Sequence, residues 1–155
     1  MTQEEKNLLL EDLCNRLSYG VKCNVGEETP YTLSGIEIDD VNGHLFDFVE
    51  KKNGLNMQVY LSEVKPYLFP LSSMTEEQKE ELINITNGKF RYMCGDITNA
   101  IPRKNISEWG ISENAYINSI KVINILYIWL LKNHFDINGL IPMGLAIDAT
   151  TMNIY

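Results

Sequence analysis

The sequence has few cysteines and histidines, and this scarcity excludes several kinds of site. Its three cysteines are Cys14, Cys23 and Cys94, with no CxxC pair, and its two histidines, His44 and His134, lack metal-ligand spacing. Small secreted domains usually carry an even, dense set of cysteines. We therefore expect reduced thiols, a cytoplasmic protein, and no metal or cofactor. Cys14 and Cys23 fall on apolar faces, so Cys94 is the one cysteine that we expect to be exposed.

Basic residues are also few. Thirteen lysines and arginines stand against 21 aspartates and glutamates, which gives a net charge of −8. General nucleic-acid binders and proteins of the membrane surface need a basic patch, so the sequence argues against both. Long apolar runs are missing too: the unbroken run at 125–131 is far shorter than the roughly 20 residues that cross a bilayer. The start of the chain is polar, unlike a secretory signal.

Catalytic and phosphate-binding motifs are absent, since no GxxxxGK[ST], GxGxxG, GxSxG or HExxH occurs. Two groups of side chains remain as candidates for acid–base chemistry. Asp39, Asp40 and Asp47 lie in or beside one hairpin, where carboxylates are usually solvated. His134 and Asp136 follow a helix end, where a histidine interacts favourably with the last carbonyls. We expect these structural roles, and a protein that is not an enzyme.

Periodic apolar patterns predict an α+β fold that begins with a helix. Thr2 and Glu5 have the spacing of a capping box, in which each side chain accepts a hydrogen bond from the other residue's backbone. Gly20 is a plausible end of this helix. One apolar stripe follows the helical spacing i, i+3, i+4 and i+7: Leu10, Leu13, Cys14 and Leu17.

Alternating residues between 21 and 64 predict a four-stranded antiparallel meander. The phase of the alternation slips at 34–35, which indicates a bulge. Asn-Gly pairs at 42–43 and 53–54 favour tight hairpin turns. The periodicity leaves open whether the sheet curls into a small open barrel. Three residues of the last strand should face the core: Met57, Val59 and Leu61.

The second half of the chain should hold two helices and an irregular tail. Prolines at 66 and 70 predict an extended crossover at 64–70, lying on the core through Leu68 and Phe69, rather than a central strand. The next helix should run over 76–86 after a capping box of Thr75 and Gln78.

The last helix should start at Ser112, be buried on most sides, and be followed by an irregular tail at 134–155. The apolar residues of this helix form two adjacent faces. The first face consists of Tyr116, Ile120, Ile123, Tyr127 and Leu130, and the second adds Ile117, Ile128 and Leu131. No repeat or linker interrupts the chain, so we expect one domain over 1–155.

Three blocks of the sequence resemble a family of short uncharacterised proteins from bacteriophages and mobile elements of gut anaerobes. They are DLCNRLSYGV at 12–21, VKPYLFPLSSMTEE at 64–77 and WLLKNHFDINGLI at 129–141, the last followed by GLA at 144–146. Ser18 and Phe69 stand where the family has proline and arginine, which weakens anion binding at the crossover. The family has no assigned activity, so the resemblance implies a genomic context only.

Residues 88–111 concentrate positive charge and aromatic rings in an otherwise acidic chain. Such a segment can attract an acidic partner and stack on a base. The leading hypothesis is a cytoplasmic interaction protein that binds a host or phage protein; the alternative is a protein that binds or sequesters a nucleotide. In both cases the candidate binding residues are Lys89, Arg91, Tyr92, Arg103, Lys104 and Trp109.

Overall fold

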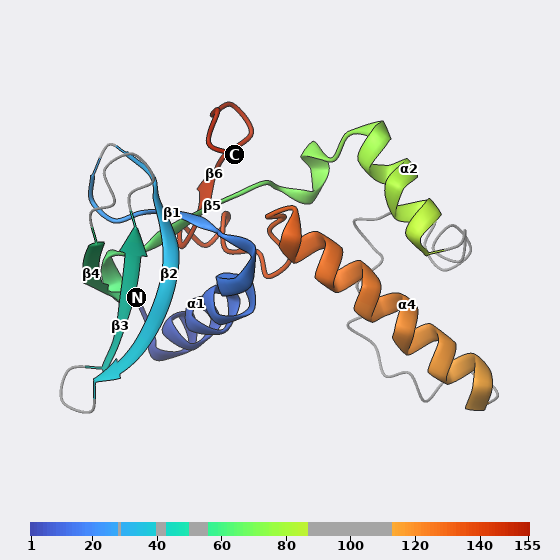
Figure 1. The fold of residues 1–155 in the computed structure, drawn as a ribbon, viewed down its shortest axis with the longest axis horizontal. Coiled ribbons are helices and arrows are strands. Elements are labelled where there is room, and N and C mark those ends of the chain that lie inside the picture. Colours follow the sequence, from blue (N-terminus) through green and yellow to red (C-terminus); the bar gives the residue numbers. More distant parts are fainter. Residues whose placement is uncertain (28, 40–42, 50–55, 87–112) are drawn as a thin grey trace.

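The computed structural model describes residues 1–27, 29–39, 43–49, 56–86 and 113–155. They form an α+β fold with a mixed six-stranded sheet, as Figure 1 shows. Helix α1 lies against the sheet, and helices α2 and α4 lie together on the other side of the molecule. The helices are α1 (Gln3–Arg16), α2 (Glu76–Ile85) and α4 (Glu113–Lys132). The strands are β1 (Lys22–Asn24), β2 (Tyr31–Asp39), β3 (Gly43–Val49), β4 (Asn56–Tyr60), β5 (Lys65–Leu68) and β6 (Ile147–Asp148).

Both predicted capping boxes are confirmed, because they depend only on local spacing. At the start of α1, the Glu5 amide donates to Thr2 Oγ1 and the Thr2 amide donates to the Glu5 carboxylate. Thr75 and Gln78 make the same exchange at the start of α2. Each box satisfies backbone donors that have no partner inside the helix.

The predicted apolar stripe of α1 is only partly correct. Leu13 is fully buried, but the helix is turned so that Leu9 takes the second core position and Cys14 is exposed. The reason is that the buried face also holds Asp12 and Arg16, a pair that an apolar pattern does not detect.

The strand order is β4-β3-β2-β1-β5-β6, so the predicted meander of four antiparallel strands is confirmed and two strands extend it. The register shifts between Leu33 and Gly35, where the sequence predicts a bulge. The described strands form an open sheet with β4 and β6 at its ends. The predicted Asn-Gly turns fall largely at 40–42 and 50–55, outside the described residues.

Two parts of the predicted C-terminal half are wrong. The segment expected as a crossover is the strand β5, in which Pro66 pairs with Cys23 of β1. The proline is tolerated because β6 pairs with Tyr67 and Leu68, so Pro66 has a neighbouring strand on one side only. The tail is also more regular than expected, since β6 lies within it and runs parallel to β5.

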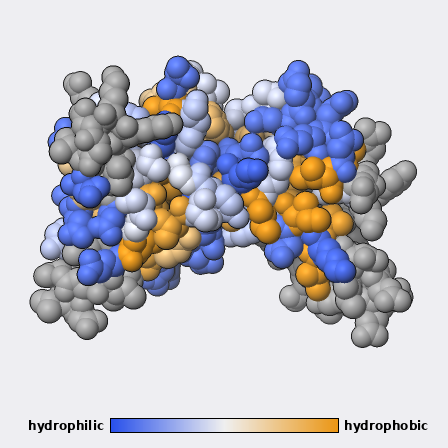
Figure 2. Space-filling model, viewed as in Figure 1, coloured by the Kyte–Doolittle hydropathy of each residue, from blue (hydrophilic) through white to orange (hydrophobic). Residues whose placement is uncertain are grey.

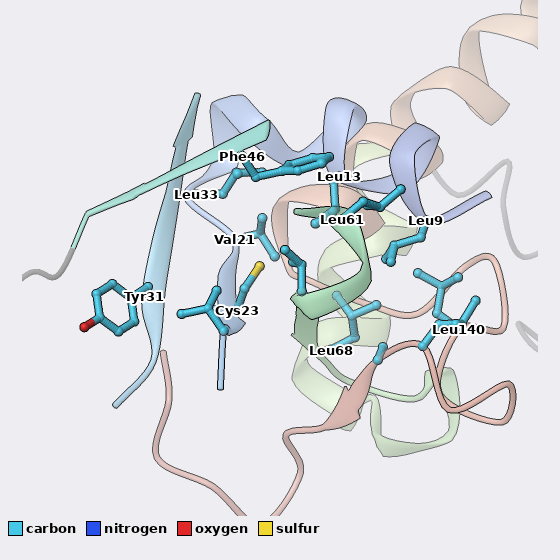
Figure 3. Close-up of a cluster of buried hydrophobic side chains, with 14 residues drawn as sticks. Leu9, Leu13, Val21, Cys23, Tyr31, Leu33, Phe46, Leu61, Leu68 and Leu140 are labelled. Atoms are coloured by element: carbon cyan, nitrogen blue, oxygen red, sulfur yellow. The ribbon is translucent and has the colours of Figure 1, made fainter. Parts of the chain in front are cut away.

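The main core lies between α1 and the sheet (Figure 3). Leu9 and Leu13 of α1 meet the inward side chains of the sheet, among them Phe46 and Leu68. The prediction that alternate residues of β4 face the core is confirmed. Met57 and Val59 are half-buried against this core, and Leu61 just after the strand is buried.

A second core joins α2 to α4. Leu82 of α2 is fully buried there with residues of α4 and of the segment after it. Trp129 stacks on Phe135, with ring centroids 5.8 Å apart and planes at 15°. Phe69 packs against this cluster, directly after Leu68 of the main core. The contact that the sequence predicts between the 64–70 segment and the core is therefore confirmed.

A buried ion pair ties α1 to the end of α4. Arg16 Nε lies 2.7 Å from Asp12 Oδ2, and both side chains are fully buried. The same guanidinium donates to the carbonyls of Leu131 at 3.3 Å and Phe135 at 2.7 Å. Asn138 Nδ2 donates to Asp12 Oδ1 at 2.9 Å, so the carboxylate is also held from the tail. Removing either charge would leave the other buried and unpaired.

We predict that Arg16→Ala lowers the free energy of unfolding by about 3–5 kcal/mol, because the Asp12 charge stays buried and two carbonyls lose their donor. Urea denaturation of both proteins measures the difference. Lys79→Ala is the control, since Lys79 and Glu76 form an exposed pair whose loss should cost less than about 1 kcal/mol. Equal midpoints for the two variants would contradict the prediction.

Candidate functional site

The residues that the sequence predicts as a binding site lie outside the described residues. All six belong to 87–112: Lys89, Arg91, Tyr92, Arg103, Lys104 and Trp109. Recognition by this segment stays a prediction. The candidate site must be sought among the side chains that the structure does describe.

Helix α4 differs most from expectation. Leu130 is buried as predicted, with 3% of its surface exposed, but Ile120 is 43% and Tyr127 36% exposed, and Ile123 is only half-buried. Ile128, which the sequence predicts on a second buried face, is 45% exposed. Leu126, Trp129 and Leu130 pack in the second core with Leu82 of α2, and Val122 and Leu131 are buried as well. The helix also contacts α1.

The opposite side of α4 is an exposed surface of mixed chemistry. Three residues of one row, spaced four apart, are Ile120, Asn124 and Ile128, and all are exposed. Such a row forms a ridge along the helix. Apolar residues show on the α2–α4 half of the molecule in Figure 2. We call the following residues the α4 surface: Ile120, Lys121, Asn124, Ile125, Tyr127 and Ile128.

The charge of this surface is opposite to that of the whole chain. Lys121 belongs to it, Lys132 extends the row by one more turn, and no aspartate or glutamate occurs between 120 and 132. Neither lysine is within ion-pair distance of a carboxylate among the described residues. The surface therefore combines half-exposed isoleucines with positive charge in a protein of net charge −8.

The α4 surface is held in a fixed orientation. Tyr127 Oη accepts a hydrogen bond from Asn15 Nδ2 of α1 at 3.2 Å. Burial, and to a smaller degree the nearby Asp12 and Glu11 carboxylates, raises the pKa of Tyr127, so the phenol is neutral. Together with the Arg16 contacts to the carbonyls after Leu130, this bond fixes the rotation of α4 about its axis.

His134 lies directly beyond α4 and is not the charged cap that the sequence indicates. Its ring is 8% exposed and stacks on Tyr155, with centroids 4.0 Å apart. Burial first, then the charges of Arg16 and Lys22, lower the pKa of His134 to about 4, so the ring is neutral near pH 7. Its buried Nδ1 has no hydrogen-bond partner among the described residues. The residue also has a φ of 59°, in the left-handed region.

The carboxylates considered for acid–base chemistry have structural partners. Asp136 accepts hydrogen bonds from the amides of Leu140 at 2.8 Å and Ile141 at 2.9 Å, and none is formed with His134. Asp47 accepts one from Gln58 Nε2 at 2.8 Å across the β3–β4 pair. These contacts stabilise a turn and a strand pair. The side chains of residues 39 and 40 lie outside the described part of the chain.

The thiols also differ from expectation. Cys14 is exposed, so the prediction that Cys94 would be the one exposed cysteine is wrong; Cys94 itself lies outside the described residues. Cys23 is buried as predicted, and burial raises the pKa of its thiol. No group of three His, Cys, Asp or Glu side chains that could hold a metal ion occurs among the described residues. No helix within this part of the chain has the length and apolarity needed to cross a membrane.

A scan against protein-family models found no match, and neither did searches of curated proteins and of solved structures.

The apolar pattern does not predict the α4 surface, although the sequence carries a signal for it. Lys121, Asn124 and Lys132 all project from one side of a 3.6-residue helix, and polar residues that share a side usually mark the solvent. The isoleucines around these polar residues conceal the signal, because a pattern of apolar residues assigns every isoleucine to the core.

We predict that Leu126→Ala and Ile128→Ala have very different effects on stability. Leu126 is 8% exposed within the second core, so its truncation should cost about 2–5 kcal/mol. Ile128 is 45% exposed, and its truncation should cost less than about 1 kcal/mol. Thermal and urea denaturation measure both. The assignment of α4's exposed side is wrong if Ile128→Ala is the more damaging change.

We also predict that the free energy of unfolding falls between pH 6.5 and about 4. The pKa of His134 is about 4 in the folded chain and 6.5, its ordinary value, in the unfolded chain, so the unfolded chain binds the proton first as the pH drops. That difference corresponds to roughly 3 kcal/mol, fully present above pH 6.5. His134→Asn, which tolerates a positive φ, should flatten this part of the profile. An unchanged slope would assign the pH dependence to other groups.

Proposed function

We propose that the protein is a non-enzymatic interaction protein and that the α4 surface is where another protein docks. The observation that carries this proposal is the exposure of Ile120, Ile125 and Ile128, each above 40%, on one side of a single helix. Scattered exposed apolar residues are ordinary, but three exposed isoleucines within nine residues of one helix form a cluster that is typical of a binding site. Removing half-exposed isoleucines from water lowers the free energy, so covering them favours binding of a partner.

The charges on this helix indicate the chemistry of the partner. Lys121 and Lys132 flank the isoleucines, so a matching surface would be apolar with acidic or aromatic groups at its edge. The net charge of −8 of the whole chain would favour a basic face on the same partner or on another one. The resemblance to phage and mobile-element proteins supports an activity in the cytosol of a host cell, with a host or phage protein as partner.

The alternative function, binding or sequestering a nucleotide, depends on residues 88–111. Its candidate residues remain those named from the sequence, and none of the described residues adds to them. Protein binding through α4 is therefore the better-supported proposal.

Affinity capture from host lysate, followed by mass spectrometry, tests the proposal. We predict that Ile120→Glu with Ile128→Glu removes the captured protein, because two carboxylates replace apolar contacts on the docking side. Tyr60→Glu is the matched control: Tyr60 is 44% exposed but lies on β4. Circular dichroism confirms that both variants fold. A captured set that is the same for the double variant and the wild type would contradict docking at α4.

A further inference from the structure

His134 combines two unfavourable features at the end of α4. Its amide donates to the carbonyl of Leu131, and the amide of Phe135 donates to the carbonyl of Leu130. These two bonds form a Schellman motif, in which glycine usually takes the left-handed position that His134 takes here with a φ of 59°. The buried Nδ1 of its ring also has no hydrogen-bond partner among the described residues. A strained backbone and an unsatisfied polar atom at one residue are typical of functional positions.

The side chain of His134 contacts the segment that follows β6. Residues 149–155, which we call the strap, turn back after that strand (Figure 1). The Tyr155 ring stacks on the imidazole, with centroids 4.0 Å apart and planes at 12°. Tyr155 Oη donates to the carbonyl of Tyr67 at 2.7 Å and accepts from the Lys22 amide at 3.2 Å. Tyr155 therefore holds the strap closed over one face of the imidazole.

The strap is held at its two ends and buries little between them. Ala149 is fully buried at one end. At the other end, Lys22 Nζ donates to the carbonyl of Ile154, next to the bonds of Tyr155. The four residues between, 150–153, are all exposed. Release of Tyr155 would therefore open the strap without removing a side chain from the buried set of either core.

We propose that the strap is an acid-sensitive closure, which stays shut while His134 is neutral and opens when its imidazole binds a proton. A proton on the closed ring would add a positive charge near two others, on Arg16 of α1 and Lys22 of β1. No carboxylate of the described residues lies within ion-pair distance of the ring. The orphaned Nδ1 likewise finds no acceptor for the added proton within this part of the chain.

The other charged and titratable groups near the ring do not offset this repulsion. The Asp12 carboxylate pairs with Arg16, and Asp136 accepts hydrogen bonds from the amides of its own turn. Burial raises the pKa of Tyr155, so its phenol is neutral. The face of the Tyr155 ring attracts cations, but Lys22 Nζ already lies 5.6 Å from its centroid. The closed strap therefore favours the neutral imidazole.

Opening the strap would return the imidazole to water and so change its affinity for a proton. The pKa of His134 is about 4 when the strap is closed, and its ordinary value in water is 6.5. This difference makes the proton bind the open form up to roughly 300-fold more tightly. Because the coupling is reciprocal, the ratio of open to closed strap should rise by the same factor as the pH falls from above 6.5 to below 4.

Amide hydrogen exchange measured by NMR tests the opening in the wild-type chain. The Lys22 amide donates to Tyr155 Oη, so it exchanges when the strap opens. The Leu33 amide donates to the carbonyl of Val21 and reports on the sheet. We expect Lys22 to be less protected than Leu33 at every pH, and its protection to fall by more than about tenfold from pH 7 to pH 4. Equal protection of the two amides would show that both exchange by unfolding of the whole chain and would overturn a separate opening.

His134→Asn tests whether this residue is the acid sensor. Asparagine accepts a positive φ and does not titrate, so the protection of the Lys22 amide should no longer depend on pH after correction for intrinsic exchange. A pH dependence like that of the wild type would overturn the assignment to His134.

An NMR titration of the His134 ring tests the same coupling in the other direction. Tyr155→Ala uncovers the imidazole, so the pKa of His134 should rise by about one or more toward its ordinary value. Met152→Ala is the matched control, since Met152 lies in the same strap with 44% of its surface exposed and should leave that pKa low. Retained protection of the Leu33 amide shows that each variant is folded. A pKa that stays near 4 in folded Tyr155→Ala would overturn the proposal.

The strap and the α4 surface are separate parts of the molecule, so this inference goes beyond the proposed docking role. Failure of the exchange and titration experiments leaves docking at α4 untouched. Failure of capture from lysate likewise leaves the acid-sensitive closure untouched.

Discussion

The buried guanidinium of Arg16 is the contact on which the described structure depends most. It is neutralised by Asp12 on its own helix, and two further N–H groups donate to carbonyls at and beyond the end of α4. A buried charge is tolerated only when its partners are all in place. Helix α1, the end of α4 and the tail residue Asn138 are therefore stable in this arrangement together. The exposed side of α4 is a consequence, because the rotation of the helix is set at this junction.

The C-terminal segment joins the two cores through its backbone. The Phe69 amide donates to the carbonyl of His134, and the amide of Asp136 donates to the carbonyl of Phe69. Farther along, the amide of Ala149 donates to the carbonyl of Leu68. Since Leu68 belongs to the main core and Phe69 packs on the second, the tail stabilises the place where the two cores meet.

Local patterns predicted the local structure, and long-range contacts explain the errors. The capping boxes, the bulge near Gly35 and the meander depend on residues within a few positions, or on neighbouring strands, so spacing revealed them. Strand β5 depends on Cys23, far from Pro66 in sequence, and the sequence pattern carries no sign of that pairing. The exposed side of α4 could not be predicted for a similar reason. Which side of α4 is buried depends on contacts with α2 and with the segment after α4, such as Leu82 and Phe135.

The composition of α4 is itself an argument for a specific partner. A helix that exposed isoleucines alone would adhere to any apolar surface, and natural proteins limit such patches. Asn124 stands in the middle of the exposed row, where a wholly apolar partner would leave its amide without hydrogen bonds. A partner that supplies a matching amide, and places no cation at Lys121, avoids that cost.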